Sequence, residues 1–100
     1  MRGFALTPLA ESDLTEIRDY LKKQSEEAPR RVLDALHEAM MRLAEMPDLG
    51  HLRDDLTDEP FRFWSVFSFL IIYRPETDPL QIVRVLHGAR DLKSLLGAKT

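Results

Sequence analysis

The residue types best able to do chemistry gather near the end of the chain, in the segment His87-Gly88-Ala89-Arg90-Asp91. Arg84 precedes it by three residues. An imidazole changes its charge near neutral pH and can transfer protons, while a guanidinium binds phosphates and carboxylates. What these few side chains do decides between an enzyme and a protein that acts by binding.

Two aliphatic runs position this cluster. Residues 69–74 (FLIIYR) and 80–87 (LQIVRVLH) are of strand length and are separated by Pro75-Glu76-Thr77-Asp78-Pro79. Short apolar runs around such a turn predict an antiparallel hairpin. The second run is apolar on both faces except at Gln81, Arg84 and His87, which predicts a central position in a sheet.

The first half of the chain predicts a short strand and two helices. Residues 4–6 are a strand candidate, and Thr7-Pro8 then supplies a hydroxyl cap and a proline for the first helical turn. The first helix buries a stripe of Ala10, Leu14, Ile17 and Leu21, with Asp13, Glu16, Asp19, Lys22 and Lys23 on its other faces. After a polar connection at 24–29, the second helix carries Val32, Leu36, Ala39, Met40, Leu43 and Met46 on one face. It ends near Met46 because Pro47-Asp48-Leu49-Gly50 follows.

The remaining segments complete an α+β domain. Residues 51–60 predict a surface loop, and 61–67 (FRFWSVF) predict a strand with Phe61, Phe63 and Phe67 on one face and Arg62, Trp64 and Val66 on the other. Ser68 is assigned to a tight turn, and residues 91–96 to a final helical turn. The order is β-α-α-β-β-β over one domain, residues 1–100, with an N-terminal strand and an antiparallel helical hairpin packed on a small, mainly antiparallel sheet.

Composition narrows the class of protein. The chain has no cysteine, which excludes disulfides and thiolate metal sites, and His37 and His51 are too isolated for a metal centre. No signal peptide is recognised at the start, and no apolar run reaches the ~20 residues of a membrane helix, so a cytoplasmic protein without membrane contact is expected. Residues 8–60 carry 14 acids and 7 bases, whereas residues 61–100 carry 3 acids and 6 bases. The net charge of −3 disfavours sequence-specific nucleic-acid binding.

Four motifs in this order resemble the RelE/ParE toxin superfamily, most closely its ParE branch. They are Thr7-Pro8-Leu9-Ala10 with Asp13-Leu14, Pro47-Asp48-Leu49-Gly50, Leu70-Ile71-Ile72-Tyr73-Arg74, and residues 82–91 (IVRVLHGARD). The resemblance spans essentially the whole chain. One departure is the turn between the second and third strands, which commonly contains glycine and here reads Val66-Phe67-Ser68-Phe69.

The resemblance implies the toxin of a type II toxin–antitoxin system, in a hetero-oligomer with a ParD-like or similar antitoxin and without a cofactor. ParE-like members are regarded as poisons of DNA gyrase, and RelE-like relatives cleave mRNA on the ribosome. A ribonuclease reading would use His87, Arg84 and Arg90 as catalytic residues, with Arg62, Arg74 and Tyr73 as further candidates. A third possibility is a degenerate, non-toxic member that only binds its antitoxin.

Three roles remain open for His87: catalysis, a structural imidazole at the strand end, and contact with a target together with Arg90 and Asp91. Strand parity counts against catalysis, because residues three apart, such as Arg84 and His87, point to opposite faces of a regular strand. Gly88 predicts a positive-φ turn, and Arg90 with Asp91 predicts a local ion pair. We therefore expect inhibition of gyrase by binding rather than by catalysis.

A domain of this size is not expected to bury all of its aromatic side chains on one side of a sheet. The candidates for antitoxin contact are Phe61, Trp64, Phe67 and Tyr73. An antitoxin segment would either lay an amphipathic helix in a groove or add a strand to an open sheet edge.

Overall fold

The computed structural model describes residues 3–96. Its elements follow the predicted order, with a 3-10 turn and a short strand added after the second helix. They are β1 (Phe4–Leu6), α1 (Pro8–Lys22), α2 (Ala28–Glu45), the 3-10 turn η1 (Pro47–Leu49), β2 (His51–Leu52), β3 (Arg62–Val66), β4 (Phe69–Arg74), β5 (Leu80–His87) and α3 (Leu92–Leu95).

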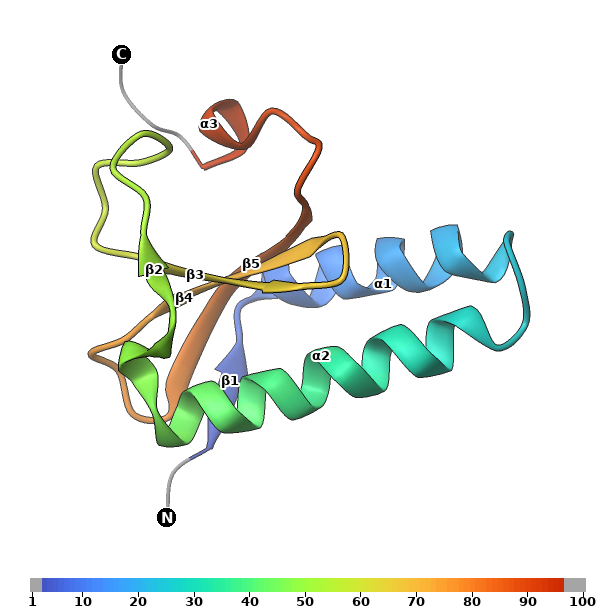
Figure 1. The fold of residues 1–100 in the computed structure, drawn as a ribbon, viewed down its shortest axis with the longest axis horizontal. Helices are drawn as coiled ribbons and strands as arrows, with labels where there is room; N and C mark the ends of the chain where they lie inside the picture. The colour runs from blue at the N-terminus through green and yellow to red at the C-terminus, as the bar shows by residue number, and fades with distance from the viewer. Residues whose placement is uncertain (1–2, 97–100) are drawn as a thin grey trace.

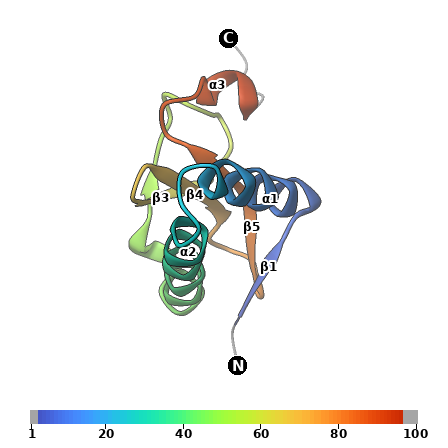
Figure 2. The ribbon, with the colours of Figure 1, turned by 90° about the vertical axis from the view of Figure 1, so that its right-hand side faces the viewer.

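The strands form one sheet in the order β1-β5-β4-β3-β2. β1 runs parallel to β5, and the other neighbours are antiparallel. α1 and α2 lie side by side as a hairpin against one face of the sheet, as Figures 1 and 2 show from two directions. The predicted α+β architecture and the central position of β5 are confirmed.

Local signals explain where the helices begin and end. The Thr7 hydroxyl accepts a hydrogen bond from the Ala10 amide at 3.0 Å, so α1 begins with the predicted cap. α2 begins at Ala28, earlier than predicted, and Pro29 lies in its first turn, where a missing N–H breaks no helical bond. It ends at Glu45, two residues before Pro47.

The sheet separates two apolar clusters. The larger one lies between the sheet and the two helices and includes Ile17, Leu36, Leu43, Ile71 and Ile82. The smaller one covers the opposite face, where Phe61, Phe63, Ile72, Leu86 and Leu92 pack together with Leu56 and Leu95. β5 supplies residues to both clusters, which explains why its sequence is apolar on both faces.

Two details differ from the sequence prediction. His51 and Leu52 are the short edge strand β2 rather than part of a loop, because they pair with Phe63 and Arg62. β3 ends at Val66, so Phe67 leaves the face predicted for it and occupies the turn to β4 with φ 54°. The hairpin of β4 and β5 around residues 75–79 is confirmed.

Among residues 3–96, no helix is long and apolar enough to span a membrane.

Candidate functional site

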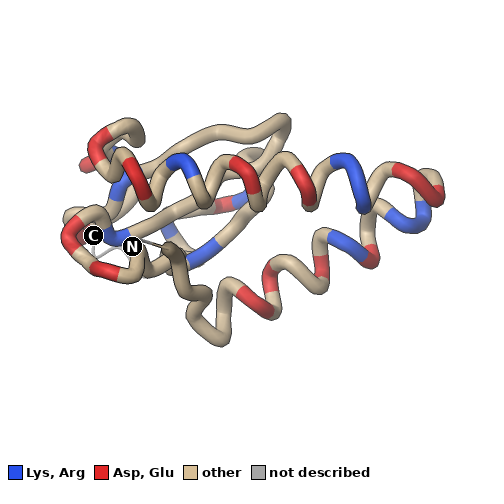
Figure 3. Tube along the Cα trace, turned by 90° about the horizontal axis from the view of Figure 1, so that it is seen from below, with Lys and Arg blue, Asp and Glu red and all other residues tan. Residues whose placement is uncertain are grey.

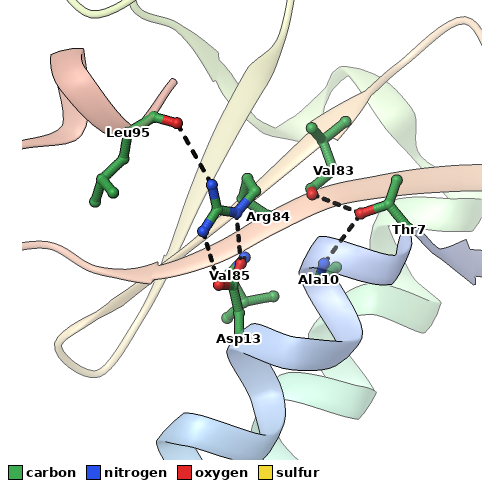
Figure 4. A network of polar contacts seen from close by, with 7 residues as sticks. All are labelled: Thr7, Ala10, Asp13, Val83, Arg84, Val85 and Leu95. Atoms are coloured by element: carbon green, nitrogen blue, oxygen red, sulfur yellow. Dashed lines mark hydrogen bonds and ion pairs between the residues drawn. The ribbon is translucent and has the colours of Figure 1, made fainter. Parts of the chain in front are cut away.

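Arg84 on β5 is held by Asp13 on α1 (Figure 4). Its Nε and Nη2 donate to the two Asp13 carboxylate oxygens at 2.8 and 2.9 Å. Nη1 also reaches the Leu95 carbonyl at 3.4 Å. The hydrogen bonds to Asp13 raise the pKa of Arg84 above its ordinary value, and both side chains are largely buried. This guanidinium is therefore committed to the interior of the protein.

The same carboxylate closes part of the outer edge of β5. Asp13 accepts the Val85 amide at 3.0 Å, and the Thr7 hydroxyl donates to the Val83 carbonyl at 2.7 Å. These residues lie beyond the end of β1, where β5 has no neighbouring strand. Side chains of α1 thus satisfy backbone groups that a missing strand would otherwise bind.

The sequence analysis predicts Asp13 on an outer face of the first helix, and this prediction is wrong. Its side chain is 5% exposed. Asp13 lies three residues after Ala10 and four before Ile17, both buried, so it occupies the inward stripe. That spacing was the available signal, but it does not reveal the partner Arg84, which lies 71 residues away.

His87 is half-buried at the end of β5. Its Nδ1 accepts the Ala89 amide at 3.1 Å, and its ring packs edge-on against Phe69 with centroids 5.3 Å apart. His87 lines a hollow of about 310 Å³ together with Ile17, Tyr20, Phe69 and Arg90. This geometry gives the imidazole the capping contact considered for it and places its ring on the helix side of the sheet.

Arg84 and His87 are not assembled into one site. Val85 belongs to the helix-side cluster and Leu86 to the opposite one, so His87 shares a face with Val85, and Arg84 with Leu86. Arg84 reaches Asp13 only by bending around the open edge of β5. Of the three residues proposed for ribonuclease chemistry, the structure brings His87 and Arg90 to one hollow.

The residues after His87 differ from their predicted roles. Within the described chain Arg90 has no carboxylate within 4.0 Å, and Asp91 instead caps α3 by accepting hydrogen bonds from the amide and hydroxyl of Ser94. The φ of Gly88 lies outside the left-handed region, and its amide donates to the Ser68 carbonyl at 2.8 Å. The left-handed residue of this region is Phe67.

The four aromatic residues proposed for antitoxin contact divide into two pairs. Phe67 is 66% exposed and Trp64 is half-buried. Phe61 and Tyr73 are buried, the latter with no exposed surface, and this differs from the exposure that the sequence analysis expected. Only Trp64 and Phe67 therefore present surface to a partner in this conformation.

Tyr73 is buried because its hydroxyl connects two segments. It donates to the Pro47 carbonyl at 2.7 Å and accepts the Gly50 amide at 2.8 Å. Arg62 donates to the Gly50 carbonyl at 2.7 Å. Gly50 has to be glycine, since an added Cβ would lie within 3 Å of the Tyr73 ring. Burial raises the pKa of Tyr73 above its ordinary value.

We call the region around His87 the His87 surface: the exposed Tyr20, Phe67 and Arg90, the half-buried His87, and the buried Phe69 beneath them. These residues line three adjacent hollows between α1, the β3–β4 turn and the segment after β5, and His87 and Phe69 line all three.

Figure 3 shows that the acidic residues are spread along both helices and are not gathered at one point. The described residues contain no group of three or more side chains arranged to hold a metal ion.

Comparison with known proteins fits this fold and this C-terminal segment. The family model of the ParE toxin of type II toxin–antitoxin system parDE matches residues 4–92. The chain belongs to the ParE toxin family. Toxin RelE3 of Caulobacter vibrioides is 28% identical over 88 residues, which are 88% of this chain and 96% of that protein. Toxin ParE3 of the same organism is 30% identical over 83 residues, 83% of this chain and 82% of that protein.

The family match confirms the resemblance recognised in the sequence. Toxins of the ParE family in type II systems pair with antitoxins. The two similar toxins bear the names of both branches, RelE and ParE. Family membership therefore establishes the kind of protein and does not determine its target.

Proposed function

We propose that this ParE-family toxin inhibits DNA gyrase by binding it, traps it in its DNA-cleaved state, and is neutralised by a cognate antitoxin. The observation that carries the proposal is the buried ion pair between Arg84 and Asp13, which leaves this guanidinium unavailable to a substrate. A ribonuclease needs a base, an acid and several cations around one phosphate. Here one of the expected cations, Arg84, leaves β5 on the opposite face from His87 and is bound to the internal carboxylate of Asp13.

The His87 surface supports a binding role. It combines an exposed aromatic side chain, Phe67, with a half-buried imidazole and the exposed guanidinium of Arg90. Aromatic residues and arginine dominate the energetics of protein–protein interfaces. We assign target contact to His87 and Arg90, with Asp91 positioning the segment through its cap on α3. Trp64 and Phe67 are assigned to antitoxin contact.

The test is a plasmid assay with purified gyrase, ATP and the purified toxin. The proposal predicts accumulation of linear, cleaved plasmid. Arg90→Gln should reduce that product by roughly tenfold, as expected for a central interface arginine, whereas the exposed helix variant Asp19→Asn should match the parent. Unchanged supercoiling and no linear plasmid would contradict the proposal.

A RelE-like, ribosome-dependent mRNA endonuclease is the second candidate, and one observation favours it. The His87 ring shares a hollow with Arg90. An imidazole and a guanidinium are the residue types from which a ribonuclease draws its acid–base group and its cation. A reconstituted translation reaction in which mRNA is cut at the ribosomal A site, and in which His87→Ala abolishes the cut, would establish this activity.

A toxin that gives neither product and does not arrest growth on expression would be a degenerate member that only binds its antitoxin.

A further inference from the structure

The outer edge of β5 continues past the end of β1. β1 pairs only with residues 80–82, so residues 83–87 have a strand neighbour, β4, on one side alone. In an antiparallel pair the N–H and C=O of alternate residues point away from the partner strand. The Val85 amide points outward, because it donates to Asp13. Val85 C=O and the backbone groups of His87 therefore point outward as well.

Most outward groups on this edge already have partners. The Val83 carbonyl accepts the Thr7 hydroxyl, the Val85 amide donates to Asp13, and the His87 carbonyl accepts the Arg90 amide at 3.1 Å. Two groups have no protein partner within residues 3–96: the Val85 carbonyl and the His87 amide. They lie two residues apart on the same edge, and both residues line the hollow between α1 and β5.

A parallel neighbour fits the two groups best. In a parallel pair, a single residue donates to the carbonyl of one residue and accepts from the amide two residues further along. The pair Val85 C=O and His87 N–H meets this requirement around Leu86. An antiparallel neighbour would need two residues to bond the same groups and would leave one N–H and one C=O of its own unpaired, because the Val85 amide is bound to Asp13 and the His87 carbonyl to Arg90.

The fold already contains this pattern on the same edge. β1 is parallel to β5, with the Leu80 amide donating to the Gly3 carbonyl at 2.8 Å and the Thr7 amide donating to the Ile82 carbonyl at 3.1 Å. Thr7 and Asp13 then interrupt the edge, which opens again at Val85 C=O.

We propose that an extended segment of the antitoxin adds to β5 as a short parallel strand, with one residue bonded to both Val85 C=O and His87 N–H. This inference rests on the antitoxin part of the proposed function and not on the gyrase part. It assigns the antitoxin a backbone contact that side-chain types in the sequence do not reveal.

The hollow defines the side chains of that segment. Leu86 faces the cluster opposite the helices, so the antitoxin residue beside it faces the same way and the residues before and after it face the hollow. The apolar walls there are Ile17, Tyr20 and Phe69, which favour an aliphatic side chain. Asp13 and Glu16 also line the hollow; Asp13 is bound to Arg84, and neither carboxylate lies within 4.0 Å of the Arg90 guanidinium. A carboxylate on the antitoxin is therefore favoured only beside Arg90, away from the α1 wall that carries Glu16.

Amide hydrogen exchange tests the proposal on the full chain, alone and in complex with the protein encoded by the adjacent gene, taken as the antitoxin. The His87 amide should exchange rapidly in the isolated toxin and at least roughly tenfold more slowly in the complex. The Leu86 amide, which faces β4, and the Val85 amide, which Asp13 holds, are internal controls protected in both samples.

A matched pair of variants tests the same bond by affinity. His87→Pro and His87→Ala both remove the imidazole, but only proline also removes the N–H. Proline is tolerated on an edge strand where the N–H points outward. The proline variant should bind the antitoxin about tenfold more weakly than the alanine variant, as expected for loss of one interface hydrogen bond.

The outcomes separate the docking site from the function. A complex in which the His87 amide stays unprotected overturns the strand proposal and leaves the antitoxin pairing intact. Protection accompanied by a short Hα–Hα contact across the new pair, characteristic of antiparallel strands, overturns the parallel arrangement. Failure to form any complex overturns the antitoxin part of the proposed function and the docking site with it, while the gyrase assay remains an independent test.

Discussion

The two ends of the sheet differ in whether the outward backbone groups of β5 have partners. At one end, where β4 finishes and β5 begins, β1 covers the edge of β5 and the Tyr73 hydroxyl joins Pro47 to Gly50. At the other end, Phe67 is exposed in the turn before β4, and β5 finishes at His87 with an outward amide that has no partner in residues 3–96. We call these the closed end and the open end.

The boundary between them is Asp13, which binds Arg84 and the Val85 amide. The comparison teaches that one strand can provide both stability and a binding edge when side chains from a neighbouring helix close only part of it. Variants at the closed end and at the boundary should change folding. Variants at the open end should change partner binding and leave folding nearly unchanged.

The largest effect is expected at the boundary. Asp13→Ala leaves a largely buried guanidinium and the Val85 amide without their acceptor, which should lower the free energy of unfolding by about 3–5 kcal/mol. Urea unfolding followed by Trp64 fluorescence measures it. Asp19→Ala, on the exposed side of the same helix, is the control and should change stability little. Equal effects from the two variants would mean that Asp13 does not hold the edge of β5.

Tyr73→Phe tests the closed end. It leaves the Gly50 amide and the Pro47 carbonyl without the hydroxyl and should cost about 1–3 kcal/mol. Tyr20→Phe removes an exposed hydroxyl and is the matched control. A loss as small as that of Tyr20→Phe would show that solvent replaces the hydroxyl without cost.

The same tyrosine gives a pH dependence. Burial raises the folded-state pKa of Tyr73 above the ordinary value of 10.0, so the folded protein keeps this proton more tightly than the unfolded chain. Stability is therefore fully present below pH 10 and falls as the pH rises above it. Unfolding curves measured across that range should show a smaller alkaline loss in Tyr73→Phe than in the parent.

Phe67 should separate stability from binding at the open end. Its φ of 54° is costly for a side-chain-bearing residue, so Phe67→Gly should stabilise the fold by roughly 0.5–1 kcal/mol. The same change removes an exposed aromatic contact and should weaken antitoxin binding by about tenfold, measured by calorimetry. Phe67→Ala loses the ring but keeps the backbone cost, so it should weaken binding without stabilising the fold.

Arg90 should give the smallest effect on folding. Arg90→Gln is expected to leave the unfolding midpoint unchanged, because this guanidinium forms no ion pair within the described residues. Antitoxin binding should weaken by roughly fivefold at low salt and by less at high salt. Arg30→Gln, on the exposed side of α2, is the control. A salt-independent loss would point to packing rather than charge.

The sequence was sufficient for the elements whose signals are local. Thr7 and Pro8 predict the start of α1, and the apolar residues on both faces of β5 predict its central position. The family resemblance, confirmed over residues 4–92, rests on the order of these elements and motifs.

The remaining features depend on contacts between distant residues. The Asp13 carboxylate can be buried only because it pairs with Arg84, and the spacing of apolar residues in the sequence does not reveal that pairing. β2 contains two residues, too few for a pattern. Phe67 reads as a strand residue by its propensity, but the hairpin places it in the turn. The open groups on β5 belong to the backbone and have no signature in residue type.

The parallel pairing of β1 with β5 also has a consequence for biosynthesis. β5 lies between β1 and β4, yet it follows all other strands in the chain. A nascent polypeptide that has not reached Leu80 has no partner for β1, no Arg84 for Asp13 and no His87 at the surface. The surface proposed to meet the target therefore cannot form during most of translation, and an antitoxin that recognises the edge of β5 would bind finished molecules rather than growing ones.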